Sequence, residues 1–215
     1  MAVWRSGRVL AHEAREVGRG QAEVLLPMAG EALRAAGLSP QDLDGVAVTR
    51  GPGGFTGMRI GLAAARGFAL ALGVPCIGVT TLEAVAWGTH ADERRDHTVL
   101  AAIESKREDI YVQLFDQNLV ALTEPMAVTG PALADQVRAH PAPLAVGDAA
   151  LRARDMLSQE GFDIAISTAP AIPDTCLVAE IAAGRFDPNL EAPPDPLYLR
   201  PPDAKLPKNQ GRARP

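Results

Sequence analysis

Residues 50–61 of this 215-residue chain have the sequence RGPGGFTGMRIG. The apolar residues at 45–49 predict a buried strand before this stretch, and a long helix is expected to follow it as far as Gly73. A strand, a glycine-rich turn and a helix N-terminus in this order present backbone N–H groups to an anion. The stretch therefore predicts an α/β unit and a candidate phosphate loop, made of Gly51, Gly53, Gly54, Thr56 and Gly57.

The same loop has a second interpretation, in which it is only a tight turn. The P-loop pattern GxxxxGK[ST] needs a lysine that is absent here, and the glycines do not fall on GxGxxG. In the second interpretation the glycines supply positive φ angles and Thr56 caps the helix. Spacing alone leaves both interpretations open.

The helix after the loop carries a ridge of small residues. Gly57, Gly61, Ala65, Ala69 and Gly73 recur at steps of four, so that no large side chain would keep a neighbouring helix or sheet at a distance. Two arginines, at positions 59 and 66, share a different face. That face either meets a partner or is simply solvated.

The rest of the first half predicts alternating strands and helices. We expect a hairpin of strands at 1–4 and 9–14, a helix at 21–36 that ends at Gly37 and a helical turn at 39–43. A strand at 74–79 and a short helix at 81–87 follow the long helix. This order predicts a mostly parallel or mixed sheet with helices packed on it.

The second half is less regular. It predicts a strand at 99–103, an antiparallel hairpin of 110–115 with 119–123, and a strand at 144–146 between helices at 131–139 and 175–183. The residues after 186 are rich in proline, which predicts an extended strap ending in a disordered tail. The expected division is an N-terminal lobe at 1–92, a C-terminal lobe at 93–186 and the strap and tail at 187–215.

Composition narrows the function classes. A net charge of −5 argues against a chain that attracts nucleic acid as a whole. The exception is the basic tail with Lys205, Lys208, Arg212 and Arg214, which is either a solvated terminus or a weak contact for RNA or an acidic partner. Two distant cysteines, Cys76 and Cys176, argue against a disulfide framework, and no apolar run reaches the length of a membrane span. A cytoplasmic protein without membrane contact is expected.

Four segments resemble one known family. Residues 50–61 resemble the GPGSFTGLRIG signature of the TsaB (YeaZ) family, residues 20–27 its HSExLLP segment, 73–83 its next block and 196–200 its PxYLR ending. The resemblance implies an actin/Hsp70/sugar-kinase (ribonuclease H-like) fold, with mixed sheets and flanking helices in two lobes. It also implies a role in making N6-threonylcarbamoyladenosine (t6A) at position 37 of tRNAs that read ANN codons.

The resemblance implies an accessory subunit and not an enzyme. It would pair with the TsaD-type transferase, a TsaE-type ATPase would join them, and tRNA would be reached through the complex. Whether the isolated chain forms a homodimer is left open by the sequence. ATP and metal would be bound by partner subunits. The catalytic paralogue carries the metal-binding motif HHxxGH, and this chain has Thr81 and Val85 at the positions of the ligands. The histidines of this chain are scattered along the sequence without metal-ligand spacing: His12, His90, His97 and His140. We therefore expect no catalytic residue, cofactor or metal on this chain.

The chain departs from the family pattern at two places. Gln21 stands where the family has histidine. Family members also begin with a strand that reads ILAIDT and carries a phosphate-site Asp, ahead of the segment that matches Ala2–Trp4. We expect the first lobe to lack this strand, which would leave backbone groups of neighbouring strands unpaired.

The expected partner-binding face lies on the two helices of the first lobe. Its predicted residues are Glu23, Leu26, Met28, Leu33, Met58, Arg59, Leu62 and Arg66. With two equivalent partner helices they would form a four-helix contact. The alternative is that the apolar members belong to the core of the monomer.

Two enzymatic alternatives remain. A glycoprotease-like peptidase would need a nucleophile with a base, for which Ser105 beside Glu104 and Lys106, or Cys76 near Thr80, are the available candidates. An ATP-binding kinase or ATPase of the same fold would need a second phosphate loop, for which Asp148 is the candidate.

Overall fold

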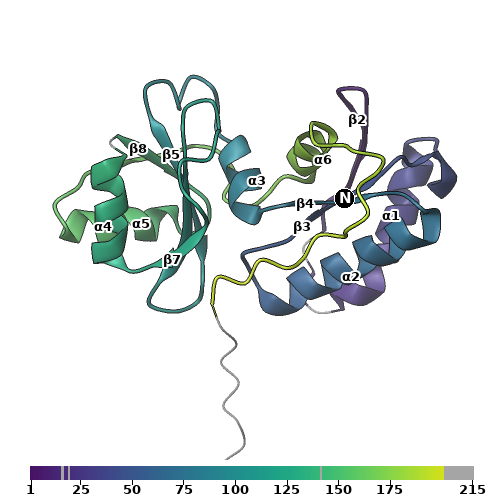
Figure 1. The fold of residues 1–215 in the computed structure, drawn as a ribbon, viewed down its shortest axis with the longest axis horizontal. Helices are drawn as coiled ribbons and strands as arrows, with labels where there is room; N and C mark the ends of the chain where they lie inside the picture. The colour runs from purple at the N-terminus through teal and green to yellow at the C-terminus, as the bar shows by residue number, and fades with distance from the viewer. Residues whose placement is uncertain (16, 19, 141, 201–215) are drawn as a thin grey trace, which may run out of the picture.

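The computed structural model describes residues 1–15, 17–18, 20–140 and 142–200, and the basic tail predicted after Asp203 lies outside them. Two lobes lie side by side, and the segment after the last helix crosses from one to the other (Figure 1). The strands are β1 Ala2–Arg5, β2 Arg8–His12, β3 Val46–Thr49, β4 Cys76–Val79, β5 Thr98–Glu104, β6 Ile110–Phe115, β7 Met126–Val128, β8 Pro143–Val146 and β9 Ala165–Ile166. The helices are α1 Gln21–Ala35, α2 Phe55–Leu72, α3 Thr81–Trp87, α4 Gly130–Ala139, α5 Ala150–Gln159 and α6 Thr175–Ala183, with a 3-10 turn at Pro40–Asp42.

The second lobe is built on one mixed sheet of five strands in the order β7-β6-β5-β8-β9. β5 pairs antiparallel with β6 and parallel with β8. Alternate residues of β5 face opposite sides, as strand geometry requires. Leu100 and Ala102 pack with α4 and α5, whereas Val99, Ala101 and Ile103 pack with α3. The sheet is therefore covered on both faces.

The first lobe has three layers. Its strands form an antiparallel pair, β1 with β2, and a parallel pair, β3 with β4. Val46 and Val48 of β3 pack with α2 on one face, and Ala47 packs with α6 on the other. In Figure 1 α6 lies on one side of β3 and β4, and α1 and α2 lie on the other. The strands of this lobe thus form two separate small sheets between helical layers.

The small-residue ridge of α2 faces this sheet. Ala65 and Ala69 are buried against Cys76 and Val46, and a Cβ placed on Gly61 would meet Val48 at 3.9 Å. The small residues therefore allow close packing of α2 on β3 and β4.

Helix α6 crosses the predicted lobe boundary. Although residues 93–186 were expected to form the second lobe, α6 packs on β1, β3 and β4 of the first lobe. Its apolar residues Val178 and Ile181 belong to one cluster with Ile77 and Ala84. The chain thus returns to the first lobe after completing the second.

The predicted hairpin of 110–115 with 119–123 is wrong in its second strand. The Asp116 carboxylate accepts hydrogen bonds from the N–H groups of Asn118 and Val120, and Leu119 has a φ of +65°. This turn leaves a single bridge, between Phe115 and Ala121, and the edge of β6 away from β5 pairs with β7 instead. Helix α5 and strand β9 were not predicted at all.

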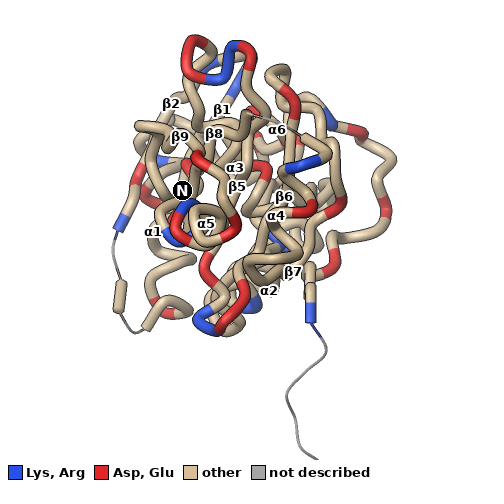
Figure 2. Tube along the Cα trace, turned by 90° about the vertical axis from the view of Figure 1, so that its left-hand side faces the viewer, with Lys and Arg blue, Asp and Glu red and all other residues tan. Residues whose placement is uncertain are grey.

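Two further observations bear on function class. No helix in the described part of the chain is long and apolar enough to cross a bilayer. Acidic and basic residues are interspersed along the trace in Figure 2.

Candidate functional site

Gly51 joins three parts of the structure. It follows β3, and its carbonyl accepts a hydrogen bond of 2.8 Å from the N–H of Thr81 at the start of α3. Its φ is +99°, and a Cβ at this position would lie 2.5 Å from Sδ of Met58 and 3.1 Å from the carbonyl oxygen of Leu197. Glycine is the residue that fits here, because the loop is pressed between α2 and the chain after α6.

The N-terminus of α2 differs from the expectation. Helix α2 begins at Phe55, its N-cap is Gly54, and no side chain caps it, so the predicted cap by Thr56 is wrong. Thr56 lies in the first turn and is exposed together with Gly54 and Gly57. Gly53 has open space around its Cα. The first turn of α2 is therefore open to solvent, and the interpretation of this loop as a phosphate site stays a prediction.

Residues 187–200, which we call the strap, are fastened to this loop and to α2. Arg66 donates to the Pro194 carbonyl from Nε at 3.2 Å and from Nη2 at 2.5 Å, and it also contacts the Asp195 carboxylate at 3.0 Å. The Leu197 N–H donates to the Arg50 carbonyl at 2.7 Å. The strap therefore packs on the folded first lobe as far as Leu197, and its last residue, Arg200, forms an ion pair with Asp109 of the second lobe.

Arg59 forms an exposed cluster with two aromatic rings. Its guanidinium carbon lies 3.7 Å from the ring centre of Phe55, and its Nε donates to the hydroxyl of Tyr198 at 2.8 Å. The two rings are tilted with centres 5.8 Å apart, and about half of each residue is exposed, 54% for Phe55 and 44% for Tyr198. A cation over an aromatic face is attractive, so this contact helps to hold the strap.

The eight predicted partner-face residues separate into three groups. Glu23 and Leu26 are exposed. Met28, Leu33 and Leu62 are buried at 4–6% exposure, so their prediction as partner contacts is wrong: they complete the monomer core. The other three, Met58, Arg59 and Arg66, contact the glycine loop or the strap of the same chain.

Helices α1 and α2 pack side by side and carry an exposed surface, of which Phe55 and Arg59 also contact Tyr198 of the strap. We call this surface the α1/α2 face, and its exposed residues are Ala22, Glu23, Leu26, Pro27, Phe55, Arg59, Ala63, Gly67 and Leu70. Leu70 is 86% exposed and Leu26 is 54% exposed. The α2 members recur at steps of four, four, four and three, so a signal existed in the sequence. It was missed because the buried ridge has the same kind of spacing and the same small residues.

The peptidase candidates have structural roles. The Ser105 hydroxyl donates to the Asp109 carboxylate at 2.7 Å within a turn, and Glu104 forms an ion pair with Arg152. Thr80 caps α3 by accepting from the N–H of Glu83.

Cys76 and Asp148 also have structural roles. Cys76 is buried, and burial raises the pKa of its thiol, which lowers the thiolate fraction that a nucleophile needs. Asp148, the candidate for a second phosphate loop, accepts a hydrogen bond of 2.8 Å from the N–H of Glu104.

Val85 and Thr81 of α3 stand at the positions where the resemblance places the metal ligands of the paralogue. Val85 is 1% exposed and packs against the five-stranded sheet, and Thr81 is half-buried where its N–H binds Gly51. Neither side chain is a usual metal ligand.

Known proteins resemble this chain in sequence and in fold. A sequence profile of the family described as TsaD, tRNA N6-adenosine threonylcarbamoyltransferase, matches residues 14–157. The tRNA threonylcarbamoyladenosine biosynthesis protein TsaB of Escherichia coli is 39% identical over 111 residues, which are 52% of this chain and 47% of that protein. The chain belongs to the TsaD-like family, on its TsaB (YeaZ) branch.

Two further likenesses extend over most of the chain. An uncharacterized protein of Mycobacterium tuberculosis is 33% identical over 92% of this chain and 83% of its own length. A crystal structure from Pseudomonas aeruginosa, described as similar to the peptidase YEAZ, superposes with a TM-score of 0.71 at 26% identity and covers 93% of both chains. The fold is therefore the one that the TsaB resemblance implied, whereas the aligned part spans only about half of the E. coli protein.

Proposed function

We propose that this TsaB-branch chain is a non-catalytic subunit for t6A synthesis on ANN-decoding tRNAs, and that it pairs with a TsaD-type transferase through the α1/α2 face. The E. coli relative is named for threonylcarbamoyladenosine biosynthesis, which supports the pathway. The observation that carries the pairing is the exposure of Leu26 and Leu70 on two adjacent helices of the first lobe.

The size and chemistry of the α1/α2 face suit a helical partner. Helix α2 has 18 residues, which gives a length of about 27 Å, and two adjacent helices are about 20 Å wide. The product of these dimensions, about 540 Å², is about two thirds of the roughly 800 Å² that each partner of a standard interface buries. Ala63 and Gly67 are exposed small residues of α2, which would let a partner helix come close to this face.

The remaining roles fall to other subunits in this proposal. The candidate nucleophiles of this chain are engaged in turns, caps or the core, so the transferase chemistry, ATP and metal belong to the TsaD-type and TsaE-type partners. tRNA is reached through the complex. A homodimer of the isolated chain would use the same face and would compete with the TsaD-type partner.

The test is a matched pair of charge substitutions on exposed leucines. Leu26→Glu changes the α1/α2 face, and Leu151→Glu changes a leucine of similar exposure, 59%, on α5 of the other lobe. Each variant is mixed with the TsaD-type protein of the same organism, and the mass is measured by light scattering after size exclusion. Circular dichroism checks that both variants are folded.

We expect the unchanged chain and Leu151→Glu to form a one-to-one heterodimer, and Leu26→Glu to lose it. A central interface leucine replaced by a charge weakens binding by about 2 kcal/mol or more, roughly thirtyfold. Pairing that survives Leu26→Glu and is lost with Leu151→Glu would place the interface on the second lobe. No pairing by any form would refute the choice of partner.

A further inference from the structure

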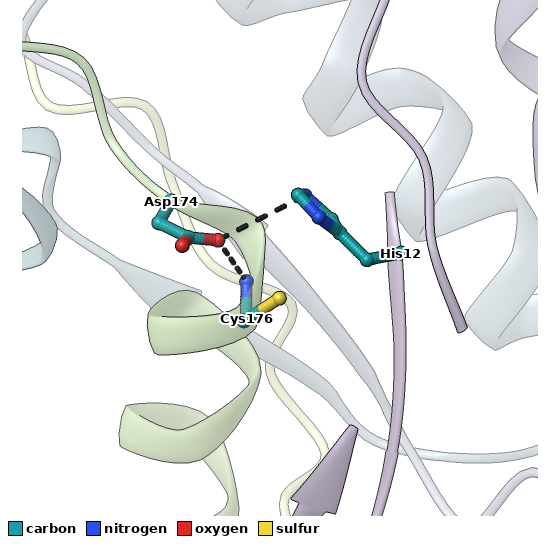
Figure 3. Close-up of side chains that lie close together, drawn as sticks. All are labelled: His12, Asp174 and Cys176. Atoms are coloured by element: carbon teal, nitrogen blue, oxygen red, sulfur yellow. Dashed lines mark hydrogen bonds and ion pairs between the residues drawn. The ribbon is translucent and has the colours of Figure 1, made fainter. Parts of the chain in front are cut away.

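Three side chains with different metal-binding atoms meet where β2 ends and α6 begins. They are His12, Asp174 and Cys176, and Figure 3 shows them converging from the two elements. The three potential ligand atoms lie within 4.8 Å of one another, and the His12 Nε2 to Asp174 Oδ1 distance is 3.9 Å. We propose that these residues form a Zn²⁺ site, which none of the relatives' names implies.

The spacing is close to what zinc needs. Zinc binds imidazole nitrogen and carboxylate oxygen at about 2.0–2.2 Å and thiolate sulfur at about 2.3 Å in a tetrahedron. Two ligand atoms on such a tetrahedron are about 3.3–3.8 Å apart. A pair of ligand atoms at the 4.8 Å limit has to close by about 1.0–1.5 Å, which side-chain rotations can provide because His12 and Asp174 are each more than 40% exposed.

The local backbone already holds two of the ligands in place. Asp174 is the N-cap of α6, and its Oδ1 accepts a hydrogen bond of 2.7 Å from the N–H of Cys176. This hydrogen bond fixes the carboxylate beside the thiol, and the lone pairs of Asp174 that it does not use stay available to a metal, which is the orienting role that outer hydrogen bonds have in metal sites.

The charges of the ligand set match a divalent cation. Cys176 binds as a thiolate after its proton passes to solvent, Asp174 binds as a carboxylate, and His12 binds as a neutral imidazole. The two negative charges balance Zn²⁺. The Met1 ammonium group is near enough to interact electrostatically with Cys176 and Asp174, so it competes with a metal ion for their negative charges. Water would complete the tetrahedron, since three protein ligands leave one position open.

A bound zinc ion would connect distant parts of the chain. His12 belongs to the β1–β2 hairpin, whereas Asp174 and Cys176 belong to the helix that returns from the second lobe. Metal that binds only the folded state raises its stability by mass action. The site would thus fasten α6 to the hairpin of the first lobe.

The experiment titrates the full chain with Co²⁺ and then Zn²⁺ after removal of metal by a chelator. The readouts are the thiolate-to-cobalt absorption in the near ultraviolet and the melting temperature. The variants are Cys176→Ala, His12→Ala and Asp174→Asn, the last of which keeps an N-cap side chain. Cys76→Ala is the control, because Cys76 is the other cysteine and is buried against α2.

We expect one Co²⁺ per chain with a thiolate absorption that Zn²⁺ displaces. The absorption should disappear in Cys176→Ala and persist in Cys76→Ala. His12→Ala and Asp174→Asn should each weaken Zn²⁺ binding by about tenfold or more and remove most of the zinc-induced rise in melting temperature. The proposal is overturned if no thiolate absorption develops, or if zinc binds equally well to Cys176→Ala and His12→Ala.

Discussion

The glycine loop offers a substitution whose cost follows from the structure. In Gly51→Ala the new Cβ meets Sδ of Met58 at 2.5 Å and the backbone oxygen of Leu197 at 3.1 Å, and the residue must keep a φ of +99°. A left-handed conformation costs a residue with a Cβ about 1–2 kcal/mol, and overpacking costs about 1–3 kcal/mol. Because the Met58 side chain can move and the Leu197 backbone is part of the strap, we expect a loss of about 3 kcal/mol.

The matched control is Gly53→Ala, two residues along the same loop. Gly53 has no positive φ and nothing within 4 Å of a Cβ, so we expect a change within about 0.5 kcal/mol. Urea unfolding followed by far-ultraviolet circular dichroism measures both variants. For a chain of this size the expected loss for Gly51→Ala corresponds to a fall in melting temperature of about 6–12 °C. Equal stability of the two variants would refute the role assigned to Gly51 as the point where loop, α2 and strap are pressed together.

Three further outcomes are expected. Gly147→Ala should destabilise the second lobe by about 3 kcal/mol or more in urea unfolding, because its Cβ would lie 2.1 Å from the Ala102 carbonyl oxygen at a φ of +110°, and a loss under 1 kcal/mol would contradict this packing. Leu62→Glu should unfold the chain, because Leu62 is only 4% exposed and burying a carboxylate costs free energy; circular dichroism measures the loss of structure. A variant that stays folded and only fails to bind a partner would show that Leu62 belongs to the interface. Hydrogen bonds from Thr168 and Ser167 lower the pKa of Glu93 from 4.5 to about 2, so its stabilisation is complete above pH 4.5 and is lost as the pH falls toward 2. The stability difference between the unchanged chain and Glu93→Gln, about 1 kcal/mol at pH 7, should therefore shrink in unfolding experiments at pH 3 and below.

The local signals in the sequence predicted most element boundaries. Gly37 and Gly73 have φ angles of +70° and +68° just after α1 and α2, where glycine was expected to stop each helix. The helices at 81–87 and 175–183 agree with α3 and α6 at both ends. Such boundaries depend on a few adjacent residues, which a single sequence displays.

The errors arose where local pattern and tertiary contact disagree. Residues 119–123 are apolar enough for a strand, yet the carboxylate of Asp116 holds the preceding residues in a turn. The face of α1 was predicted from its apolar spacing, and the structure divides that face between the core, with Met28 and Leu33, and the surface, with Leu26. Periodicity shows that a helix has an apolar side and does not show how much of that side its own chain covers.

By itself the sequence determined the α/β alternation, the glycine-rich loop between β3 and α2, and the likeness to the TsaB branch, because each is written in contiguous residues. Only the tertiary structure decided that Arg59 and Arg66 hold the strap, that Leu70 is free on the α1/α2 face, and that His12 meets Asp174 and Cys176. These contacts join residues more than a hundred positions apart or depend on what covers a helix. Their existence follows from how the layers pack, which no short window of sequence contains.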